Sequence, residues 1–96
     1  MHTDLIQTVR FIHTPNGPIV VADTPPQLLM DEVSATRLRE RLSRTLGEIP
    51  VLLRCKIGNS LTFSGDPNLQ RYAVGSMIDA LPAVRIDLEP SLQEAA

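Results

Sequence analysis

The sequence is short of the features that mark most function classes. Its 96 residues include no tryptophan, one tyrosine and two phenylalanines, so we expect an aliphatic core. The formal net charge is −2 at pH 7, which provides no general attraction to nucleic acid or to an anionic membrane. No apolar run approaches the roughly 20 residues of a membrane-spanning helix. We therefore expect neither a membrane protein nor one that binds nucleic acid through its overall charge.

Residues for metal and thiol chemistry are also scarce. Cys55 is the only cysteine, which excludes an internal disulfide and a multi-thiolate metal site. It shares a predicted strand face with apolar residues, so we interpret it as a buried, inert thiol. His2 and His13 have no cluster of further ligands, and we expect no metal and no other cofactor. The first residues show no basic segment followed by an apolar one, so we predict a cytoplasmic protein without a signal peptide.

What is present describes an ordinary globular chain. Hydrophobic residues make up 43% and charged residues 21% of the sequence, a balance typical of one folded domain of this length. The strand and helix patterns follow the order ββα(α)ββαβ. We predict a single α+β domain over residues 1–90, with a twisted sheet of about five strands packed on one side against two main helices. Residues 91–96 are expected to form a frayed tail.

The first hairpin is predicted from two β-rich segments, 7–14 and 18–22. Between them, Asn16-Gly17 is a strong signal for a two-residue turn because both residues tolerate positive φ. The resulting cross-strand pairs are Ile12 with Val21, Phe11 with Ala22, and Arg10 with Asp23. The last pair is a candidate ion pair. Apolar residues fall on both faces of this hairpin, so either both faces are covered within the monomer or a second chain covers one of them.

Two helical segments are expected to follow. Thr24 is a candidate cap for a short first helix and Ser34 for a longer second one, because the apolar pattern changes phase between them. The second helix carries an i, i+4, i+8 stripe of leucines: Leu38, Leu42 and Leu46. Gly47 is expected to end it.

The second hairpin joins strands at residues 51–57 and 61–63. A two-residue turn beginning at Gly58 would mix apolar and polar side chains on one face, so we predict a three-residue loop over 58–60. The resulting pairs are Ile57 with Leu61 and Cys55 with Phe63. This register directs Phe63 inward.

The segment 63–75, FSGDPNLQRYAVG, has the layout of many phosphate-binding loops: strand, glycine turn and helix start. Asp66 at the helix start would itself accept the free N–H groups and would repel a phosphate. Pro67 removes one further donor. We therefore interpret the segment as a capped helix rather than a ligand site. An alternating last strand is predicted to begin at Val84.

One candidate binding site is a row of arginines on the second helix. Arg37, Arg41 and Arg44 have i, i+4, i+7 spacing, which places them along one flank. They are candidates for contact with phosphates or with an acidic partner. Alternatively, they form a solvated face that complements the negative end of the helix dipole.

A second candidate site is the polar face of the sheet. Arg54, Lys56 and Arg85 are expected to share this face. Sheets that read single-stranded RNA stack bases on exposed aromatic residues. No aromatic residue is predicted on this face, so we do not expect nucleic acid as a partner.

The function that we predict is a small non-catalytic protein-interaction or regulatory module that self-associates as a homodimer. The protein partner is not identified by any motif. The alternative is a nucleic-acid-binding adaptor that uses the flank of Arg37, Arg41 and Arg44. A third hypothesis is a small enzyme with an acidic site, for which the carboxylates are Asp23, Asp66 and Asp79.

Overall fold

The computed structural model describes residues 6–75 and 78–88. Its elements are, in chain order, strands β1 (Ile6–Thr14) and β2 (Gly17–Asp23), helices α1 (Pro26–Met30) and α2 (Glu32–Thr45), strands β3 (Val51–Ile57) and β4 (Ser60–Ser64), helix α3 (Pro67–Gly75), the 3-10 turn η1 (Ile78–Ala80) and strand β5 (Val84–Asp87). The predicted α+β class and order of elements are confirmed. The predicted tail at residues 91–96 lies outside the described residues.

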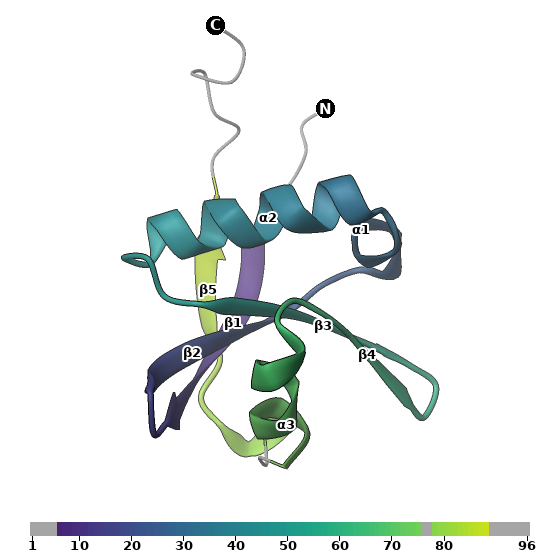
Figure 1. The fold of residues 1–96 in the computed structure, drawn as a ribbon. Coiled ribbons are helices and arrows are strands. Elements are labelled where there is room, and N and C mark those ends of the chain that lie inside the picture. Colours follow the sequence, from purple (N-terminus) through teal and green to yellow (C-terminus); the bar gives the residue numbers. More distant parts are fainter. Residues whose placement is uncertain (1–5, 76–77, 89–96) are drawn as a thin grey trace, which may run out of the picture.

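The five strands form one sheet in the order β4-β3-β2-β1-β5. β2 and β3 are parallel, and the other neighbouring pairs are antiparallel. Parallel neighbours need a long crossover connection, which α1 and α2 provide. β4 and β5 lie at opposite edges, so the chain between them must cross the sheet, and α3 and η1 lie in that crossing. Helices therefore lie on both faces of the sheet (Figure 1).

The two helical layers bury two separate apolar clusters. α1 and α2 cover a cluster that includes Val20, Leu42 and Leu53. α3 and η1 cover a cluster that includes Val21 and Leu52. The prediction that both main helices cover one side is wrong. Consecutive residues of β2 and β3 are apolar, and a strand with two apolar faces needs cover on both.

The central strand β2 bears directly on the predicted homodimer. Its residues 19–22 are at most 2% exposed. The apolar pattern on both faces of this strand is therefore satisfied within one chain. β2 therefore gives no support to the homodimer prediction, whereas Phe11 on β1 remains 37% exposed.

The turn of the first hairpin lies one residue earlier than predicted. Thr14 pairs with Gly17, so Pro15 and Asn16 are the two turn residues. The Thr14 hydroxyl accepts the Asn16 N–H at 3.1 Å and donates to the Gly17 carbonyl at 2.7 Å. Only Gly17 takes a positive φ in this turn, at 115°. The threonine side chain, rather than an Asn-Gly pair, thus fixes the turn.

The register of the first hairpin is displaced by two residues as a result. Arg10 lies opposite Val21 rather than Asp23. A displacement of two leaves every side chain on its predicted face. Arg10 therefore still reaches Asp23 diagonally, with Nη1 2.6 Å from Oδ2. The predicted ion pair is confirmed, although the predicted register is wrong.

The break between the two helices is present, but it lies at Asp31 rather than at Ser34. The Asp31 carboxylate accepts the Val33 N–H at 3.2 Å and the Ser34 hydroxyl at 2.7 Å. A carboxylate can accept both bonds at once, which makes Asp31 the better cap. Thr24 does not cap α1: its hydroxyl donates to the carbonyl of Ala22.

The end of α2 follows the prediction. Gly47 lies just beyond the helix with a φ of 90°. The N–H groups of Gly47 and Glu48 donate to the carbonyls of Arg44 and Ser43, at 3.4 and 2.6 Å. This Schellman arrangement fixes the last turn of the helix that carries the arginine flank.

The second hairpin has a two-residue turn, so the predicted three-residue loop is wrong. Ile57 pairs with Ser60 and Arg54 with Phe63. Gly58 takes the positive φ, 60°, that the first position of a type II′ turn requires. Phe63 therefore lies on the face of Arg54. β4 is an edge strand of exposed and half-buried residues, so its side-chain pattern constrains the register only weakly.

α3 begins at the predicted capped turn. Asp66 Oδ1 accepts the Asn68 N–H at 2.9 Å. Gly65 has a second role that the sequence did not reveal. A Cβ atom at this position would lie only 2.7 Å from Cδ2 of Leu52 on β3. Both this close approach and the φ of 143° require glycine.

Candidate functional site

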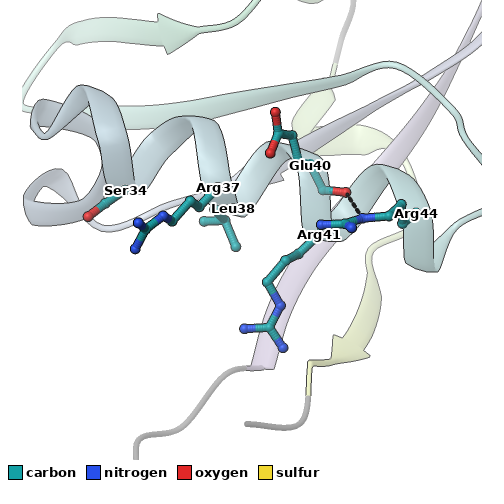
Figure 2. Close-up of a pocket in the computed structure, with 6 residues that line it drawn as sticks. All are labelled: Ser34, Arg37, Leu38, Glu40, Arg41 and Arg44. Atoms are coloured by element: carbon teal, nitrogen blue, oxygen red, sulfur yellow. Dashed lines mark hydrogen bonds between the residues drawn. The ribbon is translucent and has the colours of Figure 1, made fainter. Parts of the chain in front are cut away.

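The arginine flank of α2 is a shallow hollow on the outside of the molecule (Figure 2). It has a volume of about 500 Å³ and is lined by Ser34, Arg37, Leu38, Glu40, Arg41 and Arg44. The three arginines predicted from spacing thus line one hollow. The Arg44 Nε donates to the Glu40 carbonyl at 3.5 Å, so this side chain is held along its own helix. Glu40 also lines the hollow, and its main-chain carbonyl faces Arg44 while its carboxylate points away from the Arg41 guanidinium (Figure 2).

The polar sheet face has the predicted residues on it, but they do not converge. Arg54, Lys56 and Arg85 lie on one face by register. Arg54 is only 8% exposed, whereas Lys56 and Arg85 are exposed. β5 is three strand positions from β3, which separates Arg85 from the other two by roughly 14 Å. These cations do not form one binding surface.

Arg54 is instead the centre of an ion-pair network from four elements. Its Nε donates to Asp23 Oδ1 at 3.0 Å, and its Nη2 donates to Asp79 Oδ1 at 2.9 Å. Asp23 Oδ2 also accepts from Arg10. β1, β2, β3 and η1 are therefore joined by two arginines and two aspartates. The sequence reasoning did not find this network, although one arginine within the apolar run VLLRC was a signal for it.

The charges of this network favour a structural role. Burial by itself lowers the pKa of the Arg54 guanidinium, but its hydrogen bonds to Asp79 and Asp23 outweigh this effect and leave that pKa raised. The hydrogen bond from Arg54 lowers the pKa of the Asp79 carboxyl. A general acid or base works best with a pKa near the working pH. The network moves Asp79 away from that range.

Other residues considered from the sequence lie elsewhere. Asp66 serves as the cap of α3 and takes no part in the network. Cys55 is buried beneath α2, as predicted. In the described ranges, no three or more His, Cys, Asp or Glu side chains are grouped so as to hold a metal ion. None of the helices described is both long and apolar enough to cross a membrane.

A second hollow lies beside the network, between β4 and α3. It has a volume of about 490 Å³, and Arg54 and Asp79 form its charged wall. The rest of the lining is apolar: Leu61, Ala73, Val74, Ile78 and Ala80. Leu61 is 44% exposed and Val74 is 63% exposed. Two large apolar side chains from two elements therefore meet solvent at one place.

The outer edge of β4 borders this hollow. Within residues 6–75 and 78–88, no strand pairs with that edge, and the β3–β4 hairpin extends away from the helices (Figure 1). Edge strands are usually protected by charge or proline, but β4, with the sequence SLTFS, has neither. The opposite edge strand, β5, carries Arg85 and Asp87. The two edges of the sheet are thus chemically different.

We refer to the outer edge of β4, together with Leu61, Ala73, Val74 and Ile78, as the β4 edge site. Sequence reasoning missed it because local pattern does not reveal which strand ends a sheet. The exposed Leu61 was also expected to face inward as a partner of Ile57.

Comparison with known proteins supplies no further assignment. The chain matches no protein-family model, no curated protein and no solved structure. We therefore base the functional assignment on the geometry of three features: the β4 edge site, the arginine flank and the Arg54 network.

Proposed function

We propose that this protein is a small non-catalytic interaction module that binds an extended segment of a protein along the β4 edge site. One observation carries the proposal: an edge strand without charge or proline lies beside exposed apolar side chains. A cytoplasmic location is part of the proposal, because the single buried thiol of Cys55 suits a reducing compartment.

The proposed contact is addition of a strand to the sheet. Main-chain hydrogen bonds to an edge strand supply affinity in this mode, and pockets for alternate side chains supply specificity. Each such bond contributes a net of roughly 0.5–1.5 kcal/mol. The hollow between Leu61 and Val74 is open to an apolar side chain of the added strand. The charged wall of Arg54 and Asp79 would favour a polar group next to it.

The alternative function, a nucleic-acid-binding adaptor, has the arginine flank in its favour. Against it, Arg44 donates a hydrogen bond to the carbonyl of Glu40 in its own helix. Phe63 lies on the Arg54 face but packs against the second apolar cluster. It therefore offers no exposed ring on which a base would stack.

The third hypothesis, a small enzyme, has the least support. Asp23 and Asp79 are close to each other, but both accept hydrogen bonds from Arg54. The lowered pKa of Asp79 suits a permanent anion rather than a proton carrier. We therefore rank the enzyme below the two binding functions.

Selection of peptides tests the proposed function. A phage-displayed library of short random peptides would be selected against the protein, and the selected peptides measured by fluorescence anisotropy. We expect peptides with an apolar residue in an extended pattern. Val74→Asp should weaken their binding at least about tenfold, because the new charge lies against the buried apolar side chain.

Val33→Asp is the matched control. Val33 is also a helical valine and is 59% exposed, but it lies on α2, in the other helical layer. Its substitution should leave peptide binding unchanged. Peptides that bind both variants equally well, or a monomeric protein that selects no peptides, would refute the β4 edge site.

A further inference from the structure

We propose that the strand added at the β4 edge site is β4 of a second copy of this chain, an inference that rests on the proposed function. In this dimer the two β4 strands pair antiparallel about a two-fold axis at Thr62. The two sheets then form one continuous sheet.

The turn of the β3–β4 hairpin determines which groups point outward. A two-residue turn closes on a hydrogen-bonded pair, which here is Ile57 and Ser60. Hydrogen-bonded and non-hydrogen-bonded pairs alternate along an antiparallel ladder. Ser60, Thr62 and Ser64 therefore bond to β3. Leu61 and Phe63 direct their N–H and C=O groups away from the sheet.

The outward N–H and C=O groups of Leu61 and Phe63 can bond to the same groups of a second β4 strand. When Thr62 lies opposite Thr62 of the second copy, each Leu61 lies opposite a Phe63, in a pair that exchanges both hydrogen bonds. The two pairs supply about four main-chain hydrogen bonds. β4 contains no charged residue, so no like charges meet directly across the axis.

The apolar side chains beside β4 are also placed suitably for a two-fold axis at Thr62. A two-fold axis between antiparallel neighbours in one sheet is perpendicular to the sheet, so both copies of α3 lie on the same face. The exposed side chains of Leu61 and Val74 then face those of the second copy. Each copy thereby covers the apolar hollow of the other, which a short peptide would cover only in part.

The opposite edge of the sheet limits the assembly to two copies. A head-to-tail contact between β4 and β5 would leave free edges and propagate into a filament. β5 presents Arg85 and Asp87, and charged side chains on an edge strand oppose such pairing. Pairing of β4 with β4 uses up the unprotected edges, so the assembly closes as a dimer.

Sedimentation velocity is the first test. We expect the wild-type protein to be a dimer at micromolar concentration. Leu61→Pro removes an outward N–H without removing a bond to β3, and proline is tolerated at edge positions of this kind. This variant and Val74→Asp should each raise the dissociation constant at least about tenfold. Val33→Asp should not, and circular dichroism would verify that each variant is folded.

Cross-linking is the second test, and it reports the register. In a Cys55→Ala background, Thr62→Cys would place two thiols on Cα atoms about 4.5 Å apart, a distance that a disulfide spans. The background is needed because Cys55 is the strand partner of Thr62 within the chain. Ser60→Cys is the control, since the two copies of that residue would lie roughly 13 Å apart along the strands. Copper phenanthroline should cross-link the first variant at least about tenfold faster.

The outcomes separate this inference from the proposed function. A monomeric wild-type protein whose selected peptides are sensitive to Val74→Asp would overturn the dimer and leave the interaction module standing. A dimer that tolerates both Leu61→Pro and Val74→Asp, or equal cross-linking at residues 60 and 62, would also overturn it. A monomer that selects no peptides would contradict both proposals.

Discussion

Arg54 is a guanidinium placed where the strand pattern calls for an aliphatic side chain. It is tolerated because Asp23 and Asp79 both accept hydrogen bonds from it. A buried cation without partners would be strongly destabilising. Asp79 is the informative partner, since it belongs to η1 and thereby ties the α3–η1 layer to the sheet.

Acidification should weaken this tie. The pKa of Asp79 is lowered in the folded protein, so its contribution to stability is present above the unfolded value of about 3.9. It is lost as the pH falls through the folded value. We expect Asp79→Asn to be less stable than wild type at pH 7, with a difference that shrinks on acidification. Urea unfolding across the acid range measures it.

The control for this prediction is a double-mutant cycle. In an Arg54→Met background the hydrogen bond to Asp79 is absent, so Asp79→Asn should have little further effect on the pH dependence. If Asp79→Asn changes that dependence equally in both backgrounds, Arg54 is not the cause of the lowered pKa.

At the scale of elements, the turn into α3 has the layout of a phosphate-binding loop but acts as a helix cap. The hydrogen bond from the Asn68 N–H to Asp66 supports the cap. The close approach of Gly65 to Leu52 also explains the glycine by packing alone. Helix capping and close packing therefore account for the residues of the segment that has the layout of a phosphate-binding loop.

Removal of the cap should affect stability and little else. Asp66→Ala should lower the free energy of unfolding by about 1 kcal/mol, and Asp66→Asn by less, because asparagine also caps helices. Urea unfolding measures the loss. Association at the β4 edge site should be unchanged once stability is taken into account. A variant of normal stability that no longer associates would instead make this turn part of the binding surface.

Features fixed by neighbouring residues were the ones that the sequence could predict. The Asp66 cap and the Gly47 helix end depend on residues within a few positions, and both predictions are confirmed. The predicted three-residue loop at Gly58 was wrong because the prediction assumed that apolar and polar side chains occupy opposite faces of the hairpin. An edge strand such as β4 need not separate them in this way.

Features that depend on distant parts of the chain could not be predicted in the same way. The Arg54 network joins residues from β1, β2, β3 and η1. The β4 edge site exists because β5 pairs with β1 and leaves β4 at the rim. Apolar runs in β2 and β3 could have indicated helices on both faces, since strands covered on one side alternate more clearly.

The whole molecule is a sheet between two helical layers, with a small net negative charge. Its cations are distributed over separate places: the arginine flank lies on α2, Lys56 near a hairpin tip and Arg85 at the far edge. Affinity for phosphates grows with the number of cations that act together. This distribution argues against tight binding of nucleic acid.

We accordingly expect no submicromolar complex with mixed-sequence DNA or RNA at physiological salt. Fluorescence anisotropy at about 50 mM and about 150 mM salt would measure this, since binding through a few cations falls steeply over that range. Arg37→Glu combined with Arg41→Glu is the diagnostic variant. Tight binding at the higher salt that this variant abolishes would place the nucleic-acid adaptor above the interaction module.

The pairing of the first strand with the last has a consequence during synthesis. β1 lies between β2 and β5 in the sheet, but β5 leaves the ribosome after the other strands and helices that the structure describes. Until then β1 has one edge without its native neighbour, and such an edge can pair with another nascent chain. Each new molecule can therefore mispair at β1 until residues 84–87 dock against that strand.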